Sequence, residues 1–483
     1  MKKCMFMHGN FNPAGSGDPA YKKWCRPGAL TGRCKSRSAV GPNSMHGIPY
    51  RALCAFLWLG LISGQAPAEE VAIERIIGDT LGHSYQVKIA GEQVKAADAV
   101  KQQADAAAFP SVDLDARAAH YWGLKENSIG PNFTIPAIPD RYSSGAGLTQ
   151  PLFTGGRIIR RKDLTAEERR SAQSALAARR ADVVYQASVA YWSWSKAFYA
   201  AESFRAAVAW METHDRDMRN LRAAGLATEN EQLSTSVRLD QTRLRLEEAL
   251  RYTRLCRATI ERLTGKSLSA EAAPSRPPDD DLSAVSSEPE LIQGALTNRP
   301  EVKAQQFALT AAQKNIAIQQ AGYFPQLNAN VRGDVAKPNQ LNIPPQDEWQ
   351  FDAFVGLSAN WNIMDWGLTR GKINEAKARA NQAGHQLSQL NEQVIFEVRQ
   401  ALINLENALT RVHVARRAEE GAQLDLKSVT DLWQNGLARH ADVLDSQSRL
   451  TDAAFDLVSA RADLALGRAE LEHAYGVSEP ESP

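Results

Sequence analysis

The chain has 483 residues, of which 43% are hydrophobic, and its formal net charge at pH 7 is +1. This length is enough for two or three ordinary domains, and the near-neutral charge gives no indication of a nucleic-acid partner. Four of the five cysteines lie within the first 54 residues. A chain that loses this region keeps only Cys256 and forms no internal disulfide.

An apolar run of 11 residues, "ALCAFLWLGLI" (52–62), lies between Arg51 and the small residues "APA" (66–68). This arrangement is typical of a secretory signal peptide, and the run is too short to span a bilayer as a helix. The first predicted element is therefore a segment that the mature protein lacks.

We expect residues 45–68 to be the signal peptide, with cleavage after Ala68 and Met45 as the initiator. Residues 1–44 are then a non-native or mis-assigned extension. Cleavage removes nine basic residues and one acidic residue, which leaves 47 basic and 54 acidic residues in a mildly acidic mature chain.

The mature chain begins with a predicted helix of about 24 residues before Phe109, followed by two predicted strands. Apolar and polar residues alternate along 112–118 and again along 145–152. Alternation over about ten residues, with charge on the polar face, is the pattern of membrane β-barrel strands. A soluble β-sandwich shows the same alternation, so the strands alone leave both folds open.

Next come two predicted helices that form a hairpin. Residues 157–221 contain no proline and would form a helix roughly 100 Å long. The return helix, 226–264, covers roughly 58 Å. The aromatic residues between 191 and 199 are expected to pack between helices, although a ligand-stacking patch is the alternative.

The second half of the chain repeats the first. "LRAAGLATENEQLSTSVRL" (221–239) aligns with "LWQNGLARHADVLDSQSRL" (432–450) at an offset of 211 residues. A Pro/Asp/Ser-rich linker joins the halves. The domains are a first repeat at 69–269, the linker at 270–290, a second repeat at 291–476 and a tail at 477–483. In the second repeat the predicted elements are a helix at 299–322, strands at 327–335 and 351–363, a long helix at 368–432 and a return helix at 437–475.

Four membrane strands leave two open edges, which lipid does not tolerate, so the chain must associate with copies of itself. Two copies would give eight strands, whose interior side chains fill, whereas three copies give twelve strands and a passage. The predicted fold is therefore a mixed α+β membrane protein in which each chain contributes four transmembrane β-strands to a shared barrel. This counting supports a minimum of three copies.

Several motifs occur in a duplicated order between residues 71 and 476. They include "NRPEVKAQQFALTAAQKNIAIQQAGYFPQL", "GLTQPLFTGG", "FEVRQALINLENA", the two glycine turns and "ELEHAYG". In this order they resemble the TolC-type outer-membrane channel family of drug-efflux and type I secretion systems. One departure is "NIMDWG" (362–367), where that family usually has Pro and Gly-Gly, and we expect it to alter the bend between strand and helix.

The resemblance implies a homotrimer whose strands form a trimeric 12-stranded β-barrel in outer-membrane lipid, and a long α-helical coiled-coil barrel continues it into the periplasm. The implied partners are a periplasmic adaptor (membrane fusion) protein and an inner-membrane pump of the RND or ABC type. The implied function is the exit duct of a tripartite efflux pump or type I secretion system, gated at the periplasmic helix tips. No enzyme activity, cofactor, metal site or nucleic-acid partner is expected, since no nucleophile elbow, phosphate loop or metal-ligand spacing occurs.

The candidate gate lies just after the second glycine turn, where Asp442 and Asp445 are one helical turn apart and can share a face. The alternative role for both is to complement the helix N-terminus. The resemblance implies a cation-selective gate at these positions, held closed by Glu231 of the first repeat with an aromatic residue, Trp433, and an arginine. Ala438 occupies the arginine's position and Arg439 is adjacent.

The adaptor-docking tips are expected at the two turns themselves, because each lies about 100 Å from the strands. Their residues are Gly225, Leu226, Ala227, Gly436, Leu437 and Ala438. The alternative to a channel is a structural coiled-coil protein without transport activity, either an adhesin stalk or a periplasmic adaptor. Such a protein would need the long helices but none of the alternating strands.

Overall fold

The structure, a computed structural model, describes residues 70–476 except 129, 131–132, 278–286 and 340. The expected signal peptide, its cleavage site, the 1–44 extension and the 477–483 tail lie outside the described residues. In chain order the elements are β1 (Glu70–Val71), α1 (Ile73–His83), α2 (Tyr85–Ala106), β2 (Ser111–His120), β3 (Asn127–Ser128), β4 (Thr134–Ile135), β5 (Asp140–Phe153), α3 (Arg157–Ala223), α4 (Glu229–Thr264), β6 (Ala273–Pro274), α5 (Glu288–Asn298), α6 (Pro300–Gln320), the 3-10 helix η1 (Ala321–Tyr323), β7 (Gln326–Lys337), β8 (Gln350–Asn360), α7 (Leu368–Gln434) and α8 (His440–Tyr475).

The main sheet is antiparallel and has the strand order β2-β5-β7-β8. Its strands are the four predicted from alternation, so this part of the prediction is confirmed. The last strand, however, ends at Asn360 and not at 363. Asn360 pairs with Gln326, the first residue of β7, and the preceding Pro325 has no N–H to extend the ladder.

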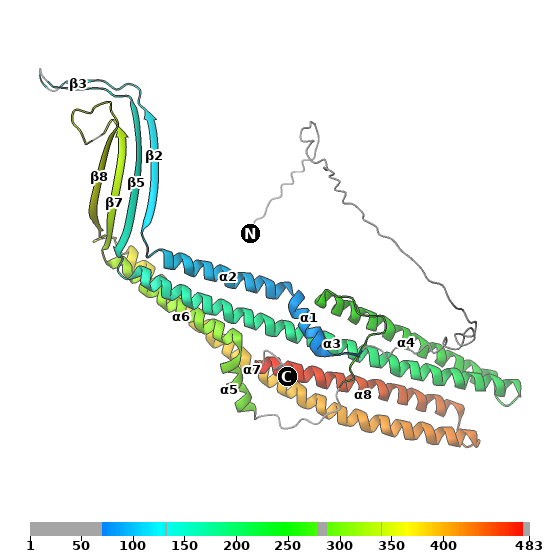
Figure 1. The fold of residues 1–483 in the computed structure, drawn as a ribbon. Coiled ribbons are helices and arrows are strands. Elements are labelled where there is room, and N and C mark those ends of the chain that lie inside the picture. The colour runs from blue at the N-terminus through cyan, green and yellow to red at the C-terminus, as the bar shows by residue number, and fades with distance from the viewer. Residues whose placement is uncertain (1–69, 129, 131–132, 278–286, 340, 477–483) are drawn as a thin grey trace, which may run out of the picture. The chain divides into compact units, whose positions relative to one another are not determined.

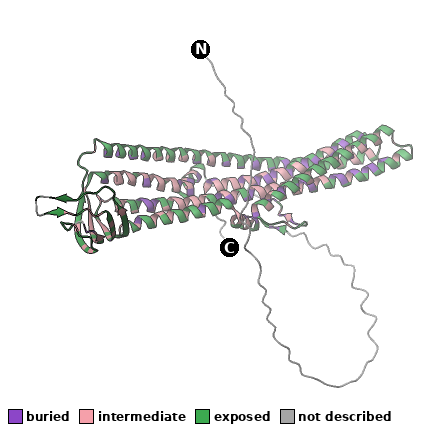
Figure 2. Cartoon of the chain, turned by 90° about the horizontal axis from the view of Figure 1, so that it is seen from above, coloured by how far each residue is buried: buried purple, intermediate pink, exposed green. Residues whose placement is uncertain are grey.

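Two 67-residue helices, α3 and α7, extend from the sheet to two turns at the opposite end of the helices (Figure 1). Helices α2 and α4 both pack against α3, and helices α6 and α8 both pack against α7. The predicted pairing of two shorter helices with each long one is therefore confirmed. Buried residues are concentrated in the helices, whereas the strands are mostly exposed or half-buried (Figure 2).

The sequence prediction missed two short helices, α1 and α5, which precede α2 and α6. Helices α1 and α2 are separated at Ser84, whose backbone is not helical (φ −53°, ψ 119°). The Oγ atom of Ser84 accepts a hydrogen bond from the N–H of Val87. The second break is at Arg299, with φ −58° and ψ 124°. Pro300 follows it and disfavours helical geometry in the residue before it.

The aromatic residues in the middle of α3 pack inside the protein, against the short strands β1 and β6. This confirms the prediction that they have a packing role. Tyr191 is fully buried; its hydroxyl donates to the carbonyl oxygen of Val71 at 2.7 Å and accepts from the N–H of Ser275 at 2.8 Å. The Tyr199 hydroxyl donates to the carbonyl oxygen of Pro274 at 3.1 Å. These bonds dock the parallel pair β1 and β6 on the middle of α3.

At "NIMDWG" the connection between strand and helix is longer than in the first repeat, since seven residues separate β8 from α7 and three separate β5 from α3, but both connections end in two left-handed residues. Before α3, Gly155 and Gly156 have φ of 63° and 80°; before α7, Trp366 and Gly367 have φ of 54° and 89°. Asp365 stabilises the second turn, since its carboxylate accepts from the N–H groups of Gly367 (3.0 Å) and Thr369 (2.7 Å). A capping carboxylate thus supports a left-handed tryptophan in place of glycine.

We expect Gly155→Ala to lower the free energy of unfolding by about 2 kcal/mol, because a Cβ there would lie 2.8 Å from the carbonyl oxygen of Ala321 and 2.9 Å from Cβ of Phe324. The matched control is Trp366→Ala, which keeps the same backbone conformation at an exposed site. Thermal unfolding in detergent, followed by circular dichroism, measures both. Equal midpoints for the two variants would contradict the packing argument.

Candidate gate at the helix tips

The two helix hairpins end in turns of the same construction. In the first, the N–H of Leu226 donates to the carbonyl of Leu221 at 2.8 Å and Gly225 has φ 72°; in the second, Leu437 donates to Leu432 at 2.8 Å and Gly436 has φ 74°. A left-handed residue is needed to close such a helix end, and glycine adopts it without a steric cost. The geometry leaves the side chains of Leu226 and Leu437 76% and 75% exposed.

Each return helix begins with a carboxylate that caps it. The Glu231 carboxylate accepts from the N–H and the hydroxyl of Thr228, at 2.8 and 2.7 Å, which lowers the pKa of Glu231. In the second repeat, Asp442 accepts from the N–H of Arg439 at 3.0 Å. Asp442 therefore has the capping role that the alternative interpretation assigned to it.

Asp442 and Asp445 lie on the exposed side of α8, as their spacing predicts. The residues between and after them, Val443, Leu444 and Ser446, are buried. Asp452 and Asp456 extend this exposed side along the helix. This side of the helix thus presents four carboxylates to solvent in the single chain.

An ion pair links the two hairpins at the level of the candidate gate. The guanidinium of Arg238 on α4 lies 3.4 Å from the carboxylate of Asp445 on α8. Two turns further along both helices, Arg245 pairs with Asp452 at 2.8 Å. The sequence prediction named Asp445 but missed both arginines, because the sequence does not indicate which side chains of α4 and α8 face each other.

Within the described part of the chain, no hydrogen bond or ion pair joins Glu231, Trp433 and Arg439 in the way that the resemblance implied. Glu231 is engaged by Thr228 of its own turn. Trp433 instead contacts two buried histidines, His214 of α3 and His440 of α8, with ring centroids 5.5 and 5.8 Å away. The arginines that do join the hairpins are Arg238 and Arg245, which lie nine and sixteen residues after the first residue of α4.

A family model described as outer membrane efflux protein matches residues 76–266 and 291–477. The chain belongs to the outer membrane efflux protein family. The two matched segments correspond to the two repeats, and members of this family are channels of the outer membrane. Membership decides against the structural coiled-coil protein without transport activity.

Individual relatives are distant but cover most of the chain. CusC of Escherichia coli strain K12, a cation efflux system protein, is 21% identical over 402 residues, covering 78% of this chain and 80% of CusC. The outer membrane protein OprJ of Pseudomonas aeruginosa is 24% identical over 334 residues, covering 68% and 69%.

Solved structures share the fold. A crystal structure of CusC superposes with a TM-score of 0.71 at 17% identity, covering 85% of this chain and 93% of CusC. The outer membrane protein VceC of Vibrio cholerae gives 0.69 at 18% identity, covering 84% and 96%. Across the described residues, none of the helices combines the length and the apolar character needed to cross a membrane.

Proposed function

We propose that three copies of this chain form the exit duct of a tripartite efflux pump or type I secretion system in the outer membrane. The observation that carries the proposal is the combination of a four-stranded sheet with open edges and two long helical hairpins in a member of the outer membrane efflux family. Closing the edges of three sheets gives twelve strands, and lipid requires closure.

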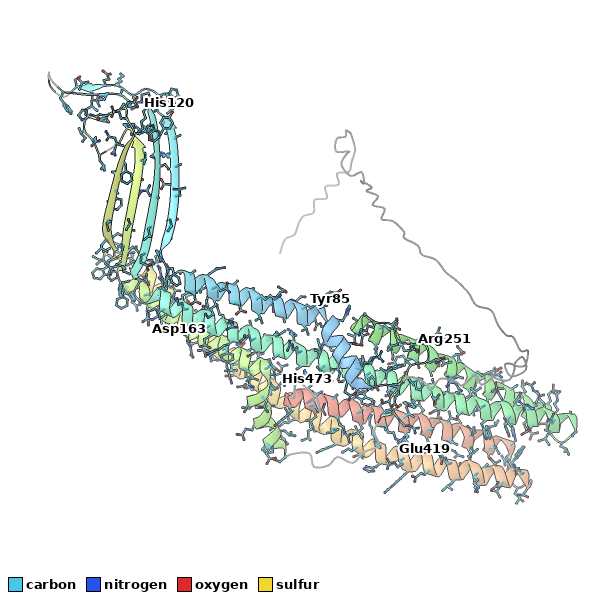
Figure 3. The ribbon with its side chains drawn as sticks, viewed as in Figure 1. Tyr85, His120, Asp163, Arg251, Glu419 and His473 are labelled. Atoms are coloured by element: carbon cyan, nitrogen blue, oxygen red, sulfur yellow. The ribbon has the colours of Figure 1, made fainter. Side chains whose placement is uncertain are left out.

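The side chains of the sheet support a position in the bilayer. Exposed aromatic residues gather at the two ends of the strands, as in the girdles of outer-membrane barrels, while His120 at the sheet end away from the helices pairs with Asp140 (Figure 3). At the helix end the exposed aromatics include Phe109, Phe153, Tyr323, Phe324, Trp361 and Trp366; at the other end they include Tyr121, Trp122, Phe133, Tyr142, Trp349 and Phe351, while Phe354 lies within β8.

One face of the sheet carries charged side chains and suits a water-filled lumen. Arg332 bridges Asp115 and Asp334 there, at 2.7 and 2.8 Å. Val331, Val335 and Val355 on the alternate face are exposed in the single chain. Lipid on the apolar face and water on the charged face would satisfy both sets of side chains.

At the tips, the exposed acids of α8 would face the axis and form a ring of six, with Asp442 and Asp445 from each chain. Such a ring attracts cations and repels anions. The Arg238–Asp445 pair would keep the hairpins together in the closed state.

The exposed leucines of the turns, with Ala227 and Ala438 beside them, would bind a periplasmic adaptor. The adaptor would connect the duct to an RND or ABC pump.

Membrane fractionation tests the proposal as a whole. We expect the protein to separate with the outer membrane, to require detergent for extraction and to migrate differently on gels before and after boiling. Recovery as a water-soluble periplasmic protein would refute the duct.

The Arg238–Asp445 pair gives a prediction about closure. Arg238→Glu places a second carboxylate beside Asp445 and should increase the open fraction in planar-bilayer recordings by on the order of fivefold per protomer. The control is Arg243→Glu, which breaks the pair with Glu212 inside the first hairpin and should leave the open fraction unchanged. If both variants open the channel alike, the link between hairpins is not what closes it.

A further inference from the structure

A cluster of four rings joins the two hairpins next to the candidate gate. His214 and His440 are stacked, with ring centroids 5.0 Å apart and planes 15° apart. Trp210 stacks on His214 at 4.8 Å, and the indole of Trp433 lies against both imidazoles. The members come from α3, α7 and α8, and we call Trp210, His214, Trp433 and His440 the tip ring cluster.

The hydrogen bonds around His440 define its neutral form. The Thr235 hydroxyl on α4 donates to the carbonyl oxygen of Glu231 at 2.9 Å, so its single proton is used. We therefore assign the imidazole N–H as the donor in the 2.8 Å contact between Nε2 of His440 and this hydroxyl. Nδ1 of His440 is then the unprotonated nitrogen, and it is buried without a hydrogen-bond partner among the described residues.

His214 is equally unsuited to carry a proton. Both histidines are buried, since His214 is 7% exposed and His440 is 6% exposed. Nε2 of His214 is buried and has no hydrogen-bond partner in the part of the chain that the structure describes. A proton on either orphan nitrogen would create a buried N–H without an acceptor, and two protonated rings at this separation would repel each other.

The charged groups that face the pair are acids. Asp215 and Asp217 on α3 act on His214, and Glu231 on α4 acts on His440. Asp215 is itself paired with Arg219 at 2.7 Å. From α7 the neighbour is the uncharged indole of Trp433, and from α8 it is His440.

Burial outweighs these acids. It lowers the pKa of His214 to about 4, with His440 adding to the decrease, and burial also lowers the pKa of His440. A histidine whose pKa falls on packing stabilises the packed state above its ordinary pKa, and this contribution is lost as the pH falls. For His214 the loss extends from about pH 6.5 down to about pH 4.

We propose that the tip ring cluster is a proton-operated latch of the gate. While both imidazoles are neutral, the cluster holds α8 against α3 and α7, with the gate carboxylate of Asp442 two residues along the chain. When the imidazoles take up protons, the rings separate and become hydrated, and the first turn of α8 moves away from the first hairpin. The latch rests on the proposed duct function and adds its regulation: mild acid on the tip side opens the channel.

Planar-bilayer recordings with the purified protein test the latch. Lowering the pH on the tip side from 7.5 to 5 should raise the open fraction of the wild type by on the order of tenfold. His214→Phe keeps a stacking ring without an ionisable nitrogen, and His440→Gln keeps a donor for Thr235. Each variant should lose most of the pH response. His413→Gln, at an exposed position of α7 about 30 Å from the turn, should respond like the wild type.

Two results would overturn the latch: a wild-type open fraction that does not change between pH 7.5 and 5, or a wild-type response in a folded His214→Phe or His440→Gln protein. If the His214→Phe protein does not assemble, the pH response of the His440→Gln protein tests the latch. Failure of the duct itself is recognised separately, because wild-type protein that conducts at no pH would refute the channel and not merely its regulation.

Discussion

Replacement of both Ala227 and Ala438 by phenylalanine is expected to abolish export. Both residues are half-buried in their turns, directly after the exposed leucines and just before the return helices. A phenyl ring at either position would occupy the space that a partner's helix end needs, and three copies would present six such obstructions. The assembled channel should remain, because the turns lie at the helix ends farthest from the sheet (Figure 1).

Export is measured as the resistance that the gene restores to a deletion strain against compounds or ions that become toxic on its loss. Assembly is followed in the same cells by the change in gel migration on boiling. The control is the pair Ala227→Ser and Ala438→Ser, which keeps the turns small and should restore full resistance. Full resistance with the phenylalanine variant would contradict docking at these turns.

The second large effect is expected from Asp442→Ala combined with Asp445→Ala. The double variant removes all six acids of the proposed ring, so the cation preference in planar bilayers should fall by on the order of fivefold, and block by multivalent cations should disappear. The single variants should differ. Asp445 is paired with Arg238, so its loss should mainly loosen the hairpins, whereas Asp442 should contribute more to selectivity.

Asp456→Ala is the control for the acids. This residue lies on the same exposed side of α8 but about 21 Å further from the turn, and its loss should leave the block intact. If the double variant keeps wild-type selectivity and block, the gate hypothesis is wrong and both aspartates serve only the start of the helix.

The elements of the fold could be predicted because their signals are local. Alternation marked the four strands of the sheet, and the absence of proline marked α3 and α7. The Thr228–Glu231 cap is likewise a local pattern, a threonine followed three residues later by a glutamate. The short helices α1 and α5 were not predicted, although Ser84 and Pro300 are both local signals that one helix ends and another begins.

The contacts of the candidate site depend on packing between distant helices and could not be predicted in the same way. Arg238 and Asp445 are 207 residues apart, and only the relative rotation and shift of α4 and α8 bring them together. The stacking of His214 on His440 has the same origin. Trp366 shows a related limit, since a capping aspartate compensates for the absent glycine and Trp366 keeps the left-handed backbone that Gly155 has in the first repeat.

The mass of the detergent-extracted protein, measured by native mass spectrometry, tests the account most directly. One chain supplies four strands with two open edges, and two chains supply eight strands whose interior is filled. The account predicts a particle of three copies that dissociates on boiling. A monomer or a dimer as the stable species extracted from the outer membrane would contradict a continuous duct.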